Sequence, residues 1–517
     1  MKIQKKFLTL PALLLAAAIL FLILYSVRLR TASLSVSKSV LTYLVQCDGE
    51  LSDVCGGDLN QSDFFQELER RTGIHINWCT SAKDLQSLYQ FGQSSRTAPD
   101  LLDHNQLYSF YGASPEKCLS EGYILDLTDL VKKYAPHYYR LIQKPEYHDI
   151  AYTSSGRIAA IYSLKTEQQN AFAGLQLRKD WLDELHLDVP ITYDDWETVL
   201  TAFKEKKNVP APLYLPSIGY MQNDALHAGF GISSGFFQSD GAVFFGPAEK
   251  GWRSYLKLLN RWYKKGLIDP NFITAATIYT PAEAIRTGAC GAWYGLYTMP
   301  STLSFDSENA KVIAAAPPKQ ASNDEFHFRH PVTYSDNCIA ISSECEDPEL
   351  ALTWIDYLFS EEGSLFASYG TEGKTYILNE NKEPEFTDLI LNNPDGLGFT
   401  QALKFYTFAP GFASAYIDWK REQQAVPEEY TAMCDVWSAG DSENLLPEHL
   451  PVSLEKKERL SEITNALNAV VYRYTTRFIT GEMAFSEYGR YLEELESCGL
   501  NEAVEIYQEA LMKDISN

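Results

Sequence analysis

Few residues of this 517-residue chain have the types and spacing that covalent chemistry requires. The segment Gly231-Ile-Ser-Ser-Gly235 matches the Gly-x-Ser-x-Gly elbow of serine hydrolases, which needs a strand before the serine and a helix after it. A strand and turn pattern follows here instead, so the sequence predicts a loop. Adjacent carboxylates such as Asp194-Asp195 are expected by chance among 68 acidic residues, and they indicate helix starts and solvated faces. We therefore predict a protein that is not an enzyme.

Two short segments contain residues that bind metals in other proteins. His327 and His330 are three positions apart, but on a strand that spacing points them to opposite faces, and no cysteine or carboxylate set completes the site. The run 379–383 has some features of a calcium loop, yet Lys382 and Pro384 stand where such a loop would have other residues. A surface strand and a turn are the predicted structures. We expect no metal and no cofactor.

Residues suited to reversible binding are more prominent. The chain has 32 tyrosines and nine tryptophans, whose rings can stack on the apolar face of a sugar. Asp103-His104-Asn105 follows the end of a short buried strand at 100–102, which is where open α/β sheets place their ligands. These three residues are candidates for ligand binding, and a solvated loop is the alternative.

Strand and helix patterns alternate in the first part of the chain. Apolar runs at 41–46, 74–78 and 100–102 predict strands, and helical spacing predicts helices over 62–72, 85–91 and 124–134. Such alternation indicates an α/β fold with a largely parallel sheet. The final third is predicted to be mainly helical, with apolar i, i+3, i+4 spacing over 454–477, 485–498 and 501–512.

The bulk composition excludes some partners. A formal net charge of -24 disfavours a nucleic acid or an anionic membrane surface, because either would need a basic face. The nine cysteines are scattered singly, so at least one is unpaired within the chain. Cys47 with Cys55, or Cys338 with Cys345, could close a small loop, and the sequence does not decide between these and reduced thiols.

The N-terminal segment 1–30 is predicted to lie outside the globular fold. Three lysines precede an uncharged run from Phe7 to Val27, which at about 1.5 Å per residue matches a hydrocarbon core of about 30 Å. A membrane anchor with the rest of the chain on the extracytoplasmic side is favoured, and a cleaved signal segment is the alternative. Residues 31–37 are then a linker to a domain over 38–517.

One long segment resembles a known family. Residues 174–206 read as a strand, a helix beginning near Asp180-Trp181, a break at Pro190-Ile-Thr192 and a second helix. They are similar to a signature of the bacterial extracellular solute-binding proteins of family 1, the receptors of carbohydrate ABC importers. No cysteine precedes Cys47, so the lipid-bearing cysteine of many members is absent. Further similar segments occur in order at 98–102, 122–136, 155–162, 240–246, 266–272, 369–376 and 477–481.

The resemblance implies a periplasmic-binding-protein-like (type II) fold. In such an α/β fold, two discontinuous lobes hold the ligand between them, and here a helix-rich C-terminal part follows. It suggests a first lobe of roughly 38–160 plus 290–340 and a second of roughly 161–289 plus 341–517, with crossings near 155–165, 290–300 and 335–345. The implied function is capture of a carbohydrate-type solute and its delivery to ABC permease subunits. A membrane-anchored sensor is the alternative, and a secreted glycan hydrolase is a weaker one.

The resemblance also selects candidate ligand residues. Trp293 and Tyr294 lie at an expected lobe crossing, with a place in the core as the alternative. Glu372 and Tyr376 belong to the 369–376 segment, which the family places near the cleft. Arg178 belongs to the most distinctive segment, although a structural role is expected for most of that segment.

Overall fold

The structure of the chain is a computed structural model. It describes residues 39–45, 49–79, 99–103, 107, 114–215, 221, 224–274, 282–303, 305–330, 332–410, 412–447 and 450–516. The proposed anchor over 1–30 and the linker over 31–37 lie outside these ranges. Within them, no helix combines the length and the apolar character needed to span a bilayer.

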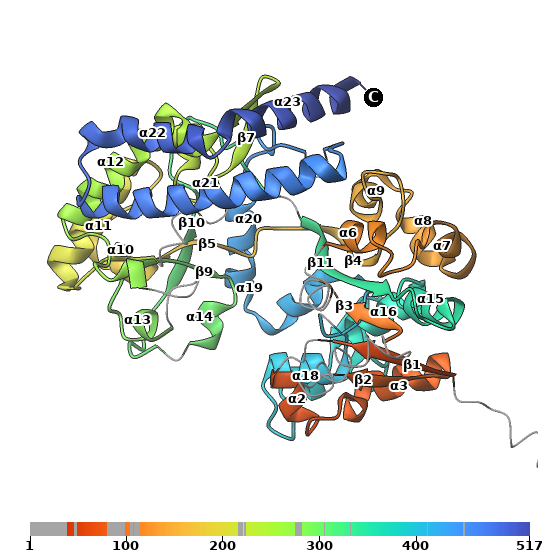
Figure 1. The fold of residues 1–517 in the computed structure, drawn as a ribbon. Helices are drawn as coiled ribbons and strands as arrows, with labels where there is room; N and C mark the ends of the chain where they lie inside the picture. Colours follow the sequence, from red (N-terminus) through yellow and green to blue (C-terminus); the bar gives the residue numbers. More distant parts are fainter. Residues whose placement is uncertain are drawn as a thin grey trace, which may run out of the picture.

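The first lobe is built on a six-stranded sheet with the order β14-β4-β11-β3-β1-β2 (Figure 1). Strand β1 is parallel to both β2 and β3, as the alternating pattern predicts. Strand β11 instead runs antiparallel to β3 and β4, so the sheet is mixed rather than largely parallel. The strands are β1 (Ser39–Leu44), β2 (Ile74–Cys79), β3 (Leu101–Asp103), β4 (Ile161–Gln169), β11 (Val332–Ile341) and β14 (Tyr416–Ile417).

Helices from two distant parts of the chain cover this sheet. Helix α3 begins after Ser62, buries Phe64, Phe65 and Leu68, and ends at Gly73, whose φ of 72° suits glycine. The aromatic side chain of Phe64 stacks on Phe366, 4.8 Å between centroids, so early and late segments share one core. The elements of this lobe are α2 (Gly49–Val54), η1 (Leu59–Gln61), α3 (Asp63–Thr72), α6 (Pro115–Ser120), α7 (Thr128–Tyr134), α8 (Pro136–Leu141), α9 (Pro145–Ala151), α15 (Pro348–Tyr357), α16 (Glu361–Tyr369), β12 (Tyr376–Leu378), β13 (Pro384–Phe386), α17 (Asp388–Leu391), α18 (Phe399–Tyr406) and η7 (Trp419–Ala425).

The second lobe is built on a four-stranded sheet with the order β10-β5-β9-β6. Strand β5 is buried at every position because neighbouring strands flank it on both sides and helices cover its faces. The elements here are β5 (Ala173–Arg178), α10 (Lys179–Leu185), α11 (Tyr193–Lys207), β6 (Leu213–Tyr214), η4 (Ala228–Phe230), β7 (Phe236–Ser239), β8 (Ala242–Phe245), η5 (Gly246–Ala248), α12 (Lys250–Lys264), η6 (Phe272–Thr274), α13 (Ala282–Arg286), β9 (Ala292–Leu296), α14 (Met299–Thr302) and β10 (Val312–Ala315).

The C-terminal helices belong to the second lobe. Helix α21 (Leu454–Thr480) packs along α12, where the side-chain amide of Asn260 donates to the carbonyls of Phe478 and Ile479. Helices α22 (Tyr488–Ser497) and α23 (Leu500–Ser516) follow after η8 (Phe485–Glu487) and complete the same core. The predicted helix-rich C-terminal part is therefore present.

The chain passes between the lobes at 170–172, between β10 and β11, and after η7 at 426–432, because β4, β11 and β14 pair in one sheet while β5 and β10 pair in the other. This division differs from the expected one. Residues 290–315 supply β9 and β10 to the second lobe, and residues 348–417 supply α15, α16 and β14 to the first. Strand pairing between distant segments leaves no local mark in the sequence, which is why the boundaries differ.

Two ion pairs link the lobes away from the crossings. The first turn of α21 extends toward α6 (Figure 1). The Nζ of Lys457 lies 3.0 Å from a carboxylate oxygen of Glu116, and the Nζ of Lys117 lies 3.1 Å from a carboxylate oxygen of Glu458. Each helix contributes one lysine and one glutamate, so the two contacts are reciprocal.

Candidate ligand site at the lobe crossings

A cavity of about 190 Å³ opens where the first two crossings meet α20 (Met433–Trp437). Strands β5 and β10 form its floor, and most of its wall is apolar or aromatic. Such a composition, with a few polar groups, is usual for a small-molecule site. The lining residues are Asn170, Ala171, Phe172, Ala173, Gly174, Leu175, Ala225, Tyr294, Ala315, Pro317, Phe326, Phe328, Arg329, His330 and Trp437.

Trp437 is fixed against the floor of the cavity. Its indole Nε1 donates to the carbonyl of Leu175 at 3.0 Å, and only 5% of the residue is exposed. The ring sits directly over Gly174, because a Cβ there would meet three indole atoms at 2.5 Å. The flanking residue Ser438 accepts the backbone N–H of Ala171, which ties α20 to the first crossing.

Residues 326–330 are held by the loop that follows α20. Asp441 N–H donates to the carbonyl of Phe326 at 2.9 Å, and Arg329 N–H donates to the carbonyl of Asp441 at 2.8 Å. The hydroxyl of Ser442 donates to the carbonyl of Arg329 at 2.6 Å. This short ladder sets the backbone positions of the aromatic and basic residues that line the cavity.

Behind His330 lies a buried carboxylate, that of Asp224. His227 Nε2 is 2.6 Å from one of its oxygens and His330 Nε2 is 2.8 Å from the other. Ser233 Oγ and the N–H of Ser234 also donate to it. Burial opposes ionisation, but the hydrogen bonds from the two histidines dominate and hold the pKa of Asp224 well below its usual range. The charged carboxylate therefore orients His330 at the edge of the cavity.

The nucleophile-elbow match is confirmed as a loop. Ser233 lies between η4 and strand β7, with no helix following it, and its hydroxyl donates to a carboxylate rather than to an imidazole. A serine in that environment is not activated as a nucleophile.

Of the predicted ligand residues, Tyr294 is the one that reaches the cavity wall among those the structure describes. Trp293, its neighbour on β9, points to the opposite face and is fully buried, with Nε1 donating to the side chain of Gln176 at 3.0 Å. Arg178 is buried at the end of β5, where it bonds to both carboxylate oxygens of Asp180 at 2.8 and 2.6 Å and covers the ring of Trp181. Trp293 and Arg178 are thus core residues here.

The other candidates that the structure describes lie in the first lobe. Asp103 is buried at the end of β3, and His104 and Asn105 lie outside the described residues. Glu372 is exposed beside the β12–β13 hairpin, and Tyr376 is buried in a small aromatic cluster with Tyr369 and Phe386. Asp103, Glu372 and Tyr376 are not among the residues that line the cavity.

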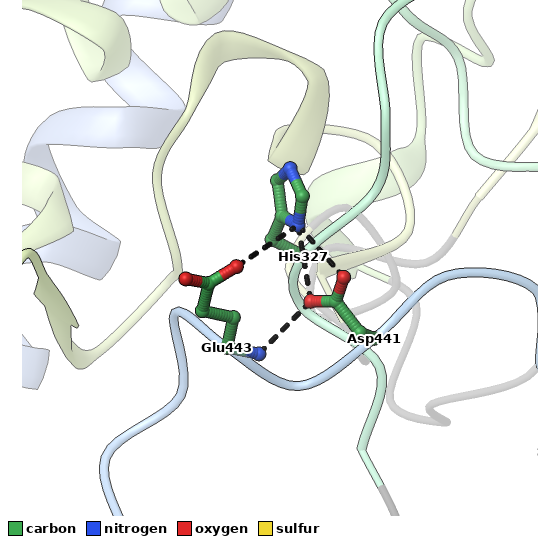
Figure 2. A group of neighbouring side chains, drawn as sticks. All are labelled: His327, Asp441 and Glu443. Atoms are coloured by element: carbon green, nitrogen blue, oxygen red, sulfur yellow. Dashed lines mark hydrogen bonds and ion pairs between the residues drawn. The ribbon is translucent and has the colours of Figure 1, made fainter.

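The two histidines of the His-x-x-His segment have separate partners, but the segment is a loop before β11 and not the predicted surface strand. His327 Nδ1 lies 3.0 Å from both carboxylate oxygens of Asp441 and 4.0 Å from Glu443 (Figure 2). The three side chains could each offer one donor atom to a cation. The Glu443 N–H and His327 together lower the pKa of Asp441, so a hydrogen-bonded surface loop accounts for the arrangement.

Two further sequence predictions can be compared with the structure. Residues 379–383 form the turn of the β12–β13 hairpin, in which Asn379 accepts the N–H groups of Asn381 and Glu383. Among the eight cysteines in the described ranges, no two form a disulfide, so Cys338 and Cys345 do not close a loop; Cys47 lies outside.

The sequence matches the family model of the bacterial extracellular solute-binding proteins over residues 61–364, more than half of the chain. The chain belongs to this family. Its relatives include the fructooligosaccharide ABC transporter substrate-binding protein FusA of Streptococcus pneumoniae, 23% identical over 480 residues that cover 87% of both chains. Lipoprotein LipO of Bacillus subtilis is 22% identical over 380 residues, which cover 69% of this chain and 70% of the relative.

Solved structures of such proteins share the fold. FusA of S. pneumoniae in complex with kestose superimposes with a TM-score of 0.70 at 21% identity, covering 93% of this chain and all of that one. A solute-binding protein of Bifidobacterium longum infantis that binds HMO gives 0.71 at 17% identity, with 92% and 99% covered. The predicted two-lobed α/β fold is confirmed by these likenesses.

Sequence reasoning missed most of the cavity wall. Phe172 and the pair of Arg329 and His330 come from two separate crossings, Trp437 comes from α20, and no spacing rule links them. The sequence held only a weak indication of these wall residues. Trp437 ends a short apolar segment, and Arg329 and His330 follow the phenylalanines at 326 and 328.

Proposed function

We propose that this protein is the substrate-binding component of an ABC importer and captures a carbohydrate in the cavity between its crossing segments. The observation that carries the proposal is an aromatic cavity where the first crossing meets the second lobe, walled by Trp437, Tyr294 and Phe172. Aromatic faces stack on the apolar face of a sugar ring, while Asn170, Arg329 and His330 can bond to its hydroxyls. The carbohydrates named for FusA and the Bifidobacterium protein support this class of solute.

The binding step requires no covalent chemistry. A ligand that contacts both lobes favours the arrangement in which the lobes are closed on it, by its differential affinity for that state. The closed protein is then recognised by ABC permease subunits. In this proposal the segment 1–30 anchors the protein at the extracytoplasmic face of the membrane, which raises its effective concentration near the permease.

The proposal is tested by a thermal-shift screen of the purified protein against mono- and oligosaccharides, including fructooligosaccharides. A saccharide at about a hundred times its dissociation constant should add about 2.7 kcal/mol to the free energy of unfolding. Trp437→Phe should weaken the shift more than Trp419→Phe, which alters a tryptophan of the first lobe. A panel without any stabilising saccharide, or a saccharide consumed during incubation, would contradict the proposal.

A further inference from the structure

His327 faces two carboxylates that come from a distant part of the chain. The carboxylates that the His-x-x-His pattern lacks are supplied by the loop after α20. His327 Nδ1 lies 3.0 Å from both oxygens of Asp441, which is 114 positions away, and 4.0 Å from an oxygen of Glu443 (Figure 2). One imidazole nitrogen and two carboxylates, from two segments, are therefore gathered in one place.

The spacing of these atoms suits a single cation. Zn²⁺ binds an imidazole nitrogen at about 2.0–2.1 Å and a carboxylate oxygen at about 2.0–2.2 Å, so two such ligand atoms lie at most about 4.3 Å apart. Both distances from His327 Nδ1 are below that limit, and the donor atoms of the three side chains all lie within 4.8 Å of one another. The side chain of Glu443 is 75% exposed, so it is free to rotate toward the other two.

Backbone contacts hold the two segments together without help from the three side chains. In addition to the ladder described above, the N–H of Asn444 donates to the carbonyl of His327 at 3.1 Å. Directly before Asp441, Gly440 has a φ of 98°, and a Cβ there would meet the carbonyl oxygen of Phe326 at 2.1 Å. Glycine thus permits a close approach of the two backbones, and the donor atoms need little ordering when a cation arrives.

Both carboxylates keep the capacity to bind a cation. One oxygen of Asp441 accepts the N–H of Glu443 at 3.0 Å, and among the described residues His327 alone contacts the other. The carboxylate of Glu443 accepts no hydrogen bond from the described part of the chain and has His327 as its charged neighbour there. The net charge of -24 attracts cations at long range.

We propose that His327, Asp441 and Glu443 form a binding site for a divalent transition-metal ion, and that Zn²⁺ is the ion that fits it. The ion would displace the Nδ1 proton that faces Asp441, and this proton would pass to solvent. Imidazole suits zinc, whereas calcium takes about six to eight oxygen ligands. An occupied site would tie the second crossing, beside the cavity wall, to the loop after α20, whatever solute the cavity takes.

Calorimetric titration of the metal-free, full-length protein with zinc chloride tests the inference. We expect one site whose affinity for zinc falls about a hundredfold or more in His327→Ala, because the change removes a ligand rather than a residue behind a ligand. Glu443→Gln alters an exposed side chain that the fold does not need, and it should weaken zinc binding about tenfold or more. Calcium chloride should not compete for the site.

His148→Ala is the matched control. His148 Nδ1 also lies 3.0 Å from a carboxylate oxygen, that of Asp149, but no second carboxylate of the described residues completes a metal-binding group there. This variant should keep the wild-type affinity for zinc. Zinc can also bind to thiols, of which Cys79, Cys345 and Cys498 are only partly buried, so affinities are compared between variants.

Anomalous diffraction at the zinc edge from zinc-soaked crystals then locates the ion. It should lie about 2.0–2.2 Å from His327 Nδ1 and from one oxygen of each carboxylate. Zinc bound only at thiols, or equal zinc affinities of the wild type, His327→Ala and Glu443→Gln, would overturn the inference. Neither result bears on carbohydrate binding, which the saccharide screen tests separately.

Discussion

At the scale of single residues, Asp224 shows how a buried acid can position a cavity residue. Its pKa is lowered by the hydrogen bonds from His227 and His330, so the ionised form stabilises the fold. That contribution is fully present above the ordinary carboxyl pKa near 4 and is lost as the pH falls toward the lower folded-state value.

We predict that Asp224→Asn lowers the free energy of unfolding by about 3 kcal/mol at pH 6, because two imidazoles and Ser233 lose a charged acceptor. Its melting temperature should fall less between pH 6 and pH 3 than that of the wild type. Scanning calorimetry at both pH values measures this. Asp149 is an exposed acid beside His148, and the control Asp149→Asn should keep the wild-type pH dependence. If the melting temperatures of the wild type and both variants changed equally with pH, the role of Asp224 would be refuted.

The contact of Gly174 with Trp437 gives a second residue-scale prediction. Gly174→Ala places a methyl group 2.5 Å from the indole, so it should destabilise the protein by about 1–3 kcal/mol and weaken ligand binding. In a Trp437→Ala background the same change should cost little, which a double-mutant cycle on urea unfolding detects. Gly489→Ala is the control, since nothing lies within 4 Å of the added Cβ. If the losses of stability from Gly174→Ala and Trp437→Ala simply added in the double variant, Gly174 and Trp437 would not be in contact.

At the scale of elements, the start of α11 is specified locally. Thr192 accepts the N–H of Asp195 at 3.2 Å, and the Asp195 carboxylate accepts the N–H of Thr192 at 2.9 Å, so the two residues form a capping box. Thr192→Ala should cost about 1 kcal/mol in urea unfolding. Thr198→Ala, in the middle of the same helix, should change stability by no more than about 0.5 kcal/mol. Equal losses from both would show that the cap contributes nothing specific.

Local signals of this kind explain which elements were predictable. The helix expected at 62–72 is α3 (Asp63–Thr72), and the one expected at 454–477 is α21 (Leu454–Thr480). Caps, glycine stops and apolar periodicity act within one or two turns, so the sequence displays them. The pairing of β5 with β9 and β10 depends on residues more than a hundred positions apart.

The candidate site was predictable only in its chemical character. The aromatic composition predicted sugar stacking, and among the predicted ligand residues Tyr294 is placed in the wall of the candidate cavity. Trp293 was also predicted to bind ligand, but it lies outside the cavity wall. Neighbouring residues on a strand face opposite ways, and the sequence does not say which face is buried. Trp437 and Arg329 reach the cavity through tertiary contacts with Leu175 and Asp441, which no local pattern reveals.

At the scale of the whole molecule, the ion pairs between α6 and α21 join the lobes at a second place. The pairs are partly exposed, so each contributes at most about 1 kcal/mol, and salt weakens them.

We predict that Lys117→Glu speeds amide hydrogen exchange in α6 and in the first turn of α21, because it replaces an attraction to Glu458 by a repulsion. The double change Lys117→Glu with Glu458→Lys should restore slow exchange. Lys132→Glu, on α7, should have no effect at either place. Exchange measured by mass spectrometry decides this, and a failure of the double change to restore protection would argue against the contact.

The threefold crossing of the chain also dictates the order in which the protein can fold during synthesis. The first sheet lacks its edge strand until Tyr416 and Ile417 have been made, and the second core lacks α21 to α23 until Ser516 has been made. Neither lobe can close early, so apolar surfaces of both stay exposed in the nascent chain, where aggregation competes with folding. A nascent chain of this topology therefore depends more on chaperones than one with two contiguous lobes.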